Sequence, residues 1–325
     1  MKIFSFPHVV IYELMEEFEP NELISLSFCS TRAHALVKTF SRTSQELEVE
    51  VQPFYDGYLL TFPGVRLMIL PKQPTYLDPT RLLTRYGLNF CFELSGRICS
   101  CCADAVQGCR ETTNYICDLF KIPVSTVVIS RETDLWLLDF AQRRQEQRLR
   151  TVETWHFEAS ADGYSRVMRC NATDRLDCCM LPPDNYRFDG KLPSVKKLNI
   201  THGKWLTREH LLRLESTKVQ LGYTLTRSSD INALLRCWLA GEGLGNLEYF
   251  FSDRTYDDRI YEGIRDRLER IQEEIIYNDE FQSEVRFTTN NAFHIRRDDG
   301  VVATVMYDDQ CLVMAVWPDS DGNFY

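Results

Sequence analysis

Residues 195–251 read VKKLNITHGKWLTREHLLRLESTKVQLGYTLTRSSDINALLRCWLAGEGLGNLEYFF and alternate between two patterns. Three short runs rich in apolar and β-branched residues are typical of strands: 195–200, 217–224 and 246–251. The stretches between them, 207–214 and 228–241, repeat their leucines at the spacing of one helix face. Each helix would carry the chain back to the same end of the sheet, so we expect these strands to pair in parallel.

This alternation indicates the α/β fold class. The predicted strands recur about every 23 to 29 residues, near the length of one leucine-rich repeat, although the leucine-rich consensus is not matched. We therefore expect a leucine-rich-repeat-like α/β domain, with a curved and largely parallel sheet and helices on one side.

The chain after residue 251 predicts two further features. Apolar residues recur at helical spacing from Ile260 to Ile275, which predicts a long helix. The later segments NAFHIRR, VVATVMY and CLVMAVW alternate apolar and polar residues and turn at Asp298–Gly300. They predict a terminal antiparallel meander that closes the edge of the sheet.

Upstream, the pattern also changes along the chain. The apolar runs at 57–62 and 65–70 flank Pro63–Gly64 and predict two strands joined by a tight turn. A strand at 125–130 precedes a helical pattern at 133–147. The Pro- and Tyr-containing stretch LPKQPTYLDPT is typical of a loop.

The first 45 residues predict three short helices. Val10, Ile11, Leu14 and Met15 form one helical stripe, and Pro20 is suited to begin a second helix. Apolar residues cover more than one face of these helices, and a unit of about 45 residues can bury only part of its surface. The surplus must contact either the following domain or another protein.

Length, composition and charge exclude several classes of protein. The chain has 325 residues, of which 44% are hydrophobic and 26% charged, as in an average globular protein. A net charge of −10 argues against nucleic-acid binding, and no apolar run reaches the roughly 18–20 residues that span a bilayer. The acidic N-terminal segment does not resemble a secretory signal. We therefore expect a cytoplasmic or nuclear protein, or one found in both compartments.

Twelve cysteines are expected to be free thiols in a reducing compartment. Five of them cluster: Cys99, Cys101, Cys102, Cys109 and Cys117. Only Cys99 and Cys102 have the spacing of a zinc-binding pair, since seven residues separate the last two cysteines. Buried thiols are the favoured interpretation, and zinc binding by this cluster stays open.

Residues suited to catalysis do not come together in the sequence. None of the six histidines stands in a motif that pairs it with a serine or cysteine nucleophile. The glycines of GEGLG (241–245) follow a helix and precede a strand, the reverse of the order found in phosphate-binding loops. We expect neither catalytic residues nor a cofactor nor a metal site.

The N-terminal stretch FPHVVIYELMEEFEPNELISLSFCSTRAHALVKTF (6–40) resembles the F-box, the helical motif that docks onto Skp1 in SCF ubiquitin ligases. Phe6–Pro7 stands where the F-box has its Leu-Pro entry. The positions that match the two apolar helices of the family include Leu14, Met15, Pro20, Leu23 and Leu26.

A second stretch, about residues 185–255, resembles the type-2 F-box-associated (FBA_2) domain of nematode F-box proteins. The matching positions in its helix and the next strand are Asp230, Asn232, Leu235, Trp238 and Leu247. The segments IRRDDGVVATVMY and MAVW resemble later parts of the same family.

The two resemblances together imply a non-catalytic substrate-recognition adaptor of an SCF (Skp1–cullin–F-box) E3 ubiquitin ligase. An F-box at 1–45 would bind a Skp1-like protein and, through it, cullin and RING subunits, while residues 46–325 bind an unidentified protein substrate. The implied Skp1-binding residues are Phe6, Pro7, Ile11, Leu14, Met15, Pro20, Leu23 and Leu26. Two alternatives stay open: a Skp1-binding protein outside any ligase, and a zinc-binding or thiol enzyme that uses the Cys99–Cys117 cluster.

Overall fold

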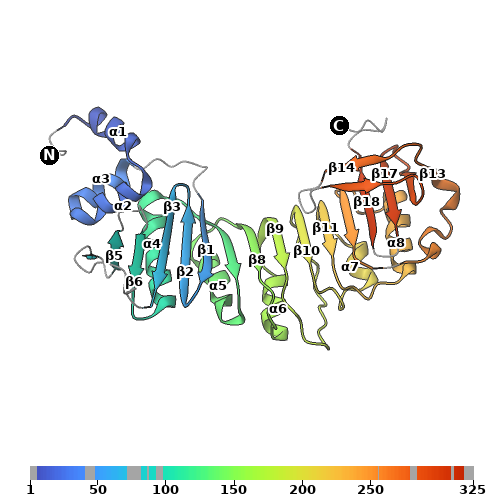
Figure 1. Ribbon diagram of the computed structural model, residues 1–325, viewed down its shortest axis with the longest axis horizontal. Helices are drawn as coiled ribbons and strands as arrows, with labels where there is room; N and C mark the ends of the chain where they lie inside the picture. Colours follow the sequence, from blue (N-terminus) through green and yellow to red (C-terminus); the bar gives the residue numbers. More distant parts are fainter. Residues whose placement is uncertain are drawn as a thin grey trace. The chain divides into compact units, whose positions relative to one another are not determined.

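The chain folds as two compact units, residues 1–149 and 150–325, in a computed structural model. The structure describes residues 6–40, 48–71, 82–85, 88–92, 98–254, 256–278, 284–308 and 311–317. Helices and a mixed sheet occur in both units (Figure 1), which confirms the mixed α/β class.

Three helices open the first unit, as the sequence predicts: α1 (His8–Glu17), α2 (Pro20–Cys29) and α3 (Thr31–Phe40). Pro20 begins α2, and the backbone N–H of Glu19 donates to the Glu22 carboxylate at 2.9 Å. The hydroxyl of Ser30 accepts from the backbone N–H of Ala33 at 3.0 Å and so caps α3.

The sheet of the first unit has the strand order β7-β1-β2-β3-β6-β5-β4. The strands are β1 (Val49–Phe54), β2 (Gly57–Phe62), β3 (Val65–Leu70), β4 (Leu82–Arg85), β5 (Leu88–Phe92), β6 (Ile98–Cys101) and β7 (Val124–Ile129). The pairs β1–β7 and β3–β6 are parallel, and the other neighbours are antiparallel. The predicted strands at 57–62 and 65–70 are confirmed, whereas most of the predicted loop LPKQPTYLDPT lies outside the described residues.

Two helices and a 3-10 turn complete this unit: α4 (Ala105–Phe120), η3 (Glu132–Leu135) and α5 (Trp136–Arg144). The helix α5 lies within the predicted helical stretch. The helix α4 is not anticipated by the sequence analysis, although Asp104 caps it by accepting from the backbone N–H of Val106 at 2.8 Å.

The second unit begins with strands in chain order: β8 (Leu149–Thr154), β9 (Ala172–Cys178), β10 (Lys197–Ile200), β11 (Lys218–Leu221) and β12 (Tyr249–Ser252). The predicted parallel pairing is confirmed for β10, β11 and β12, and β9, a strand that the sequence analysis does not predict, also pairs in parallel with β10. The helices α6 (Ala161–Met168), α7 (Arg208–Leu212) and α8 (Ser228–Leu239) stand between strands. The starts of β9 to β12 lie 25, 21 and 31 residues apart, and the likeness to leucine-rich repeats stays a prediction.

The predicted antiparallel meander is also present. It consists of β16 (Ala292–Arg296), β17 (Val302–Tyr307) and β18 (Leu312–Val316), and β18 pairs with β12. The short strand β13 (Leu268–Arg270) pairs with β16, and β14 (Ile275–Tyr277) forms a hairpin with β15 (Val285–Phe287).

The predicted long helix from Ile260 to Ile275 is wrong. This stretch contains the 3-10 turns η4 (Asp258–Tyr261) and η5 (Arg265–Arg267) and the strand β13. Gly263 between the turns has φ +71°, outside the helical region. The isoleucines of the stretch are buried as the pattern suggests, but Ile271 and Ile275, the first residue of β14, pack in one core cluster with Val285 and Phe287 of β15.

Candidate functional site

The residues implied to bind Skp1 divide between surface and interior. Phe6 and Pro7 are exposed; Leu14, Pro20 and Leu26 are half-buried; Ile11, Met15 and Leu23 are buried. The exposed apolar residues of this region gather on α1 and just before it: Phe6, Pro7, Val9, Val10 and Tyr12. We call these five residues the α1 surface.

The helices α2 and α3 contact α4 (Ala105–Phe120) through side chains on both helices. The hydroxyl of Tyr115 shares a hydrogen bond of 2.5 Å with Ser27 and one of 3.3 Å with His34 Nδ1. Phe28 packs its ring 5.1 Å from Tyr115 and 4.6 Å from Phe90 of β5. The apolar surplus of the N-terminal helices is therefore partly buried within the first unit and partly exposed on the α1 surface.

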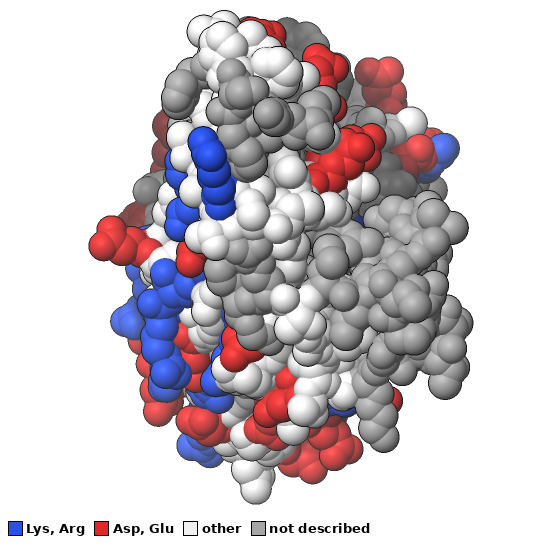
Figure 2. Space-filling model, turned by 90° about the vertical axis from the view of Figure 1, so that its left-hand side faces the viewer, with Lys and Arg blue, Asp and Glu red and all other residues white. Residues whose placement is uncertain are grey.

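Figure 2 views this end of the chain, where much of the described surface toward the top of the view is uncharged. Val9 is 72% exposed and Phe6, Val10 and Tyr12 about 40% each, which is unusual for large apolar side chains that neighbour one another. Contiguous exposed apolar surface marks sites of protein contact in soluble proteins.

The cysteine cluster does not form an evident metal or nucleophile site. Cys99 lies in β6, and Cys109 and Cys117 are buried on α4. Burial raises the pKa of Cys102 to about 11 and that of Cys117 to about 12, which opposes the thiolate form that a nucleophile needs. Nowhere in the part of the chain that the structure describes do three or more His, Cys, Asp or Glu side chains gather as a metal site requires.

In the second unit, exposed rings collect where parallel strands end. Trp155 and His156 directly follow β8, while His202 and Tyr223 come two residues after β10 and β11. Asp253 directly follows β12. Parallel strands present their carboxyl ends at one edge of the sheet, which is the usual place for ligands in open α/β sheets. We call Trp155, His156, His202, Tyr223 and Asp253 the rim.

Three rings of the rim contact one another. The imidazole of His202 stacks on the Tyr223 ring with 5.2 Å between centroids and 11° between planes. On its other side, His202 Nε2 lies 3.3 Å from His156 Nδ1 and shares a hydrogen bond with it. Burial lowers the pKa of His202, and the neighbouring His156 and Lys204 lower it further, so this imidazole is neutral near pH 7.

The backbone holds these side chains in place. Tyr223 has φ +44°, a strained conformation for a residue other than glycine, and its N–H donates to Asp253 Oδ1 at 2.8 Å. The N–H of Gly203 donates to the carbonyl of Gly222 at 2.8 Å. A Cβ on Gly222 would lie 2.6 Å from the carbonyl oxygen of Thr201, so only glycine allows these two loops to approach so closely.

A buried network of hydroxyl hydrogen bonds links the loop after β11 to the end of β12 and the chain that follows it. The hydroxyl of Tyr256 shares hydrogen bonds with Thr226 (2.8 Å) and Ser252 (2.9 Å), and Thr226 shares another with Thr224 (2.9 Å). Between these threonines, Leu225 stays 61% exposed. A fully satisfied network of this kind makes the loop rigid and presents Tyr223 and Leu225 to solvent.

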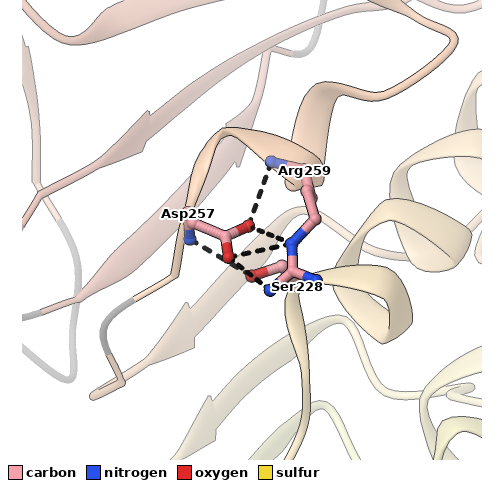
Figure 3. Close-up of polar contacts among 3 residues, drawn as sticks. All are labelled: Ser228, Asp257 and Arg259. Atoms are coloured by element: carbon pink, nitrogen blue, oxygen red, sulfur yellow. Dashed lines mark hydrogen bonds and ion pairs between the residues drawn. The ribbon is translucent and has the colours of Figure 1, made fainter.

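Figure 3 shows how the chain after β12 is fastened to the start of α8. The guanidinium of Arg259 donates to both oxygens of Asp257, and the Asp257 N–H donates to the hydroxyl of Ser228 at 3.1 Å. The hydrogen bonds from Arg259 and Ser228 hold the pKa of Asp257 well below its usual range. The charges of Arg259 and Asp257 are paired with each other. We therefore assign this cluster a structural role: it orders the chain that follows β12.

Three residues of α8 at positions that match the family also have a structural role. Trp238 and Leu235 are fully buried on α8. The amide of Asn232 donates to the carbonyls of Ile260 (3.0 Å) and Glu262 (2.8 Å), which satisfies backbone groups of the neighbouring turn as expected for this helix face.

Sequence reasoning did not find the rim. The sequence analysis singles out none of Trp155, His156, His202 and Tyr223 as a site residue. The available signal was positional, because each of these residues stands within two places of the end of a strand that pairs in a parallel sheet. Because residues 156, 202, 223 and 253 of the rim lie far apart in the sequence, no sequence motif links them.

Residues 191–251 match a family model described as F-box associated (FBA_2), within the stretch 185–255 that carries the resemblance in the sequence. The matched stretch supplies β10, α7, β11 and α8, and with them His202 and Tyr223 of the rim. No curated protein and no solved structure matches the chain. None of the helices in the described parts of the chain has the length and apolar character that crossing a membrane requires.

Proposed function

We propose that this chain is the substrate-recognition adaptor of an SCF ubiquitin ligase, located in the cytoplasm, the nucleus or both. The N-terminal helices bind a Skp1-like protein, through which cullin and RING subunits join. The second unit binds a protein substrate. The chain itself carries no catalytic step, and its contribution is to hold the substrate close to the recruited enzymes.

The observation that carries this proposal is the F-box associated match at residues 191–251. Proteins of that description combine the domain with an F-box, and the α1 surface supplies exposed apolar side chains at the position where the F-box resemblance places Skp1. Binding of an apolar helix face in a partner's groove is a common mode of protein recognition.

The test uses a variant of the α1 surface that leaves the buried residues alone. Phe6→Ser combined with Val10→Asp alters two exposed side chains, whereas replacing Leu23 would also disturb the packing of α2. We expect Skp1 co-purification to fall at least tenfold while the melting temperature stays unchanged. Tyr55→Ser is the matched control, because Tyr55 is 85% exposed and lies outside these helices.

Two outcomes would overturn parts of the proposal. Unchanged recovery of Skp1 with the double variant removes the F-box assignment. Recovery of Skp1 without cullin and a RING subunit, from cells treated with a proteasome inhibitor, supports instead a Skp1-binding protein outside any ligase.

A further inference from the structure

We propose that the rim binds a basic segment of the protein substrate, with an arginine or lysine side chain lying on the Tyr223 ring, which stacks on His202. This inference rests on the proposed adaptor function and names the chemistry of its substrate. It assigns to the second unit a binding surface at the carboxyl ends of β8, β10, β11 and β12.

Ring chemistry is the first argument. The side chain of Trp155 is 52% exposed and that of Tyr223 60%. The His202 ring stacks in parallel on the Tyr223 ring. Aromatic faces attract cations through the ring quadrupole, and the planar guanidinium of arginine also stacks on them. Because His202 is neutral near pH 7, it supports the Tyr223 ring by stacking without adding a positive charge beside the bound cation.

Charge is the second argument. Asp253 is exposed beside the stacked rings, and its carboxylate adds an ion-pairing group for a cationic side chain. The chain as a whole has a net charge of −10, which attracts basic partners at long range. Arg254, the next residue, donates from Nη1 to the carbonyl of Thr224 at 2.9 Å and so is turned to the backbone. The positive charge of Lys204 repels a cationic ligand, so a substitution at Lys204 also tests the proposal.

The third argument is preorganisation. Tyr223 is held in a strained backbone conformation by its hydrogen bond to Asp253, and Gly203 and Gly222 bond the adjoining loops to each other. A surface whose aromatic side chains are fixed before binding loses less conformational entropy when the partner docks. Tryptophan and tyrosine are also the residues that most often dominate the energy of protein interfaces.

The experiment selects ligands without knowing the substrate. A phage library of random 12-residue peptides is panned against the full chain, and the affinity of the best peptides is then measured on variants. We expect the selected peptides to be enriched in arginine or lysine over the input library. We expect Tyr223→Ser to weaken their binding at least tenfold without lowering the melting temperature.

Two charge variants sharpen the test. Asp253→Asn keeps an oxygen that can accept from the Tyr223 N–H but removes the negative charge, and we expect binding to weaken about three- to tenfold. Lys204→Glu should strengthen binding. Tyr55→Ser is again the matched control, because Tyr55 is also an exposed tyrosine with positive φ (+49°) but stands between β1 and β2.

Each contrary result overturns the inference. A library that yields no binder, peptides without basic enrichment, or basic peptides that bind Tyr223→Ser as well as the unaltered chain would all refute it. These measurements need no Skp1, and the α1-surface test needs no peptide, so failure of this inference and failure of the adaptor function are separately visible.

Discussion

The guanidinium carbon of Arg297 lies 5.3 Å from the centroid of the Trp238 ring. These residues come from the turn between β16 and β17 and from α8, and the backbone N–H of Asp298 also donates to the carbonyl of Leu239 at 3.1 Å. Asp299 binds the guanidinium of Arg297 through both carboxylate oxygens. The terminal meander is therefore joined to α8 by a contact that covers the most deeply buried aromatic ring of that helix.

Trp238→Ala should lower the free energy of unfolding by about 3–5 kcal/mol, because it leaves a large cavity and removes the ring beneath Arg297. Trp238→Phe should cost less, since the indole Nε1 has no hydrogen-bond partner among the described residues. Trp155→Ala is the control and should change stability by less than about 0.5 kcal/mol, as usual for a surface position. Urea unfolding of the three variants measures this order, and an unaltered midpoint for Trp238→Ala would contradict it.

Asn232→Ala removes two hydrogen bonds to the turn η4 and leaves the carbonyls of Ile260 and Glu262 without that donor. We expect a loss of about 1–3 kcal/mol, because each of the two hydrogen bonds, one part-buried and one exposed, typically contributes roughly 0.5–1.5 kcal/mol. Asn232→Asp should be no better, because a carboxylate cannot donate to a carbonyl. The exposed Asn246 provides a neutral Asn→Ala control. Equal stability of the Asn232 and Asn246 variants would show that the two Asn232 hydrogen bonds do not stabilise the fold.

The sequence predicted several helices and strands, the parallel pairing of β10 to β12 and the terminal meander, but not the side chains that this pairing brings together. The strands at 57–62 and 65–70 and the helix after Arg227 could be identified because apolar spacing and a turn or an Asp230 cap occur within one short segment. The stretch from Ile260 to Ile275 has helical apolar spacing for another reason, namely that its buried isoleucines belong to separate short elements, Ile260 to η4 and Ile275 to β14. The rim could not be predicted, because register and parallel pairing bring His156 and His202 together across 46 residues.

His210 makes the stability of the second unit dependent on pH. Its Nε2 lies 2.9 Å from the carbonyl of Phe188 and donates to it, so Nδ1 is left to accept from the Thr207 N–H at 3.1 Å. Burial lowers the pKa of His210, and a proton on Nδ1 would break the cap of α7. The unfolded chain therefore takes up this proton first, at its ordinary pKa of about 6.5.

The resulting stability is complete above pH 6.5 and is lost as the pH falls toward the lowered pKa, at up to about 1.4 kcal/mol per pH unit for one proton. His202 and His294 also have lowered pKa values and add to the same trend. Urea unfolding at pH 7.5 and 5.5 should show a smaller difference for His210→Gln than for the unaltered chain. An identical difference in both proteins would mean that His210 does not couple folding to protonation.

Thiol reactivity provides the last prediction and separates a structural cysteine cluster from a reactive one. Burial raises the pKa of Cys102 to about 11, so at pH 7.5 its thiolate is on the order of 100-fold scarcer than that of an ordinary cysteine. Cys109 is fully buried on α4, whereas Cys29 is exposed at the end of α2. Iodoacetamide should therefore label Cys29 first, and Cys102 and Cys109 only slowly or after denaturation, as read by peptide mass spectrometry. Native labelling of Cys102 as fast as Cys29 would contradict this assignment and favour a thiol enzyme over an adaptor.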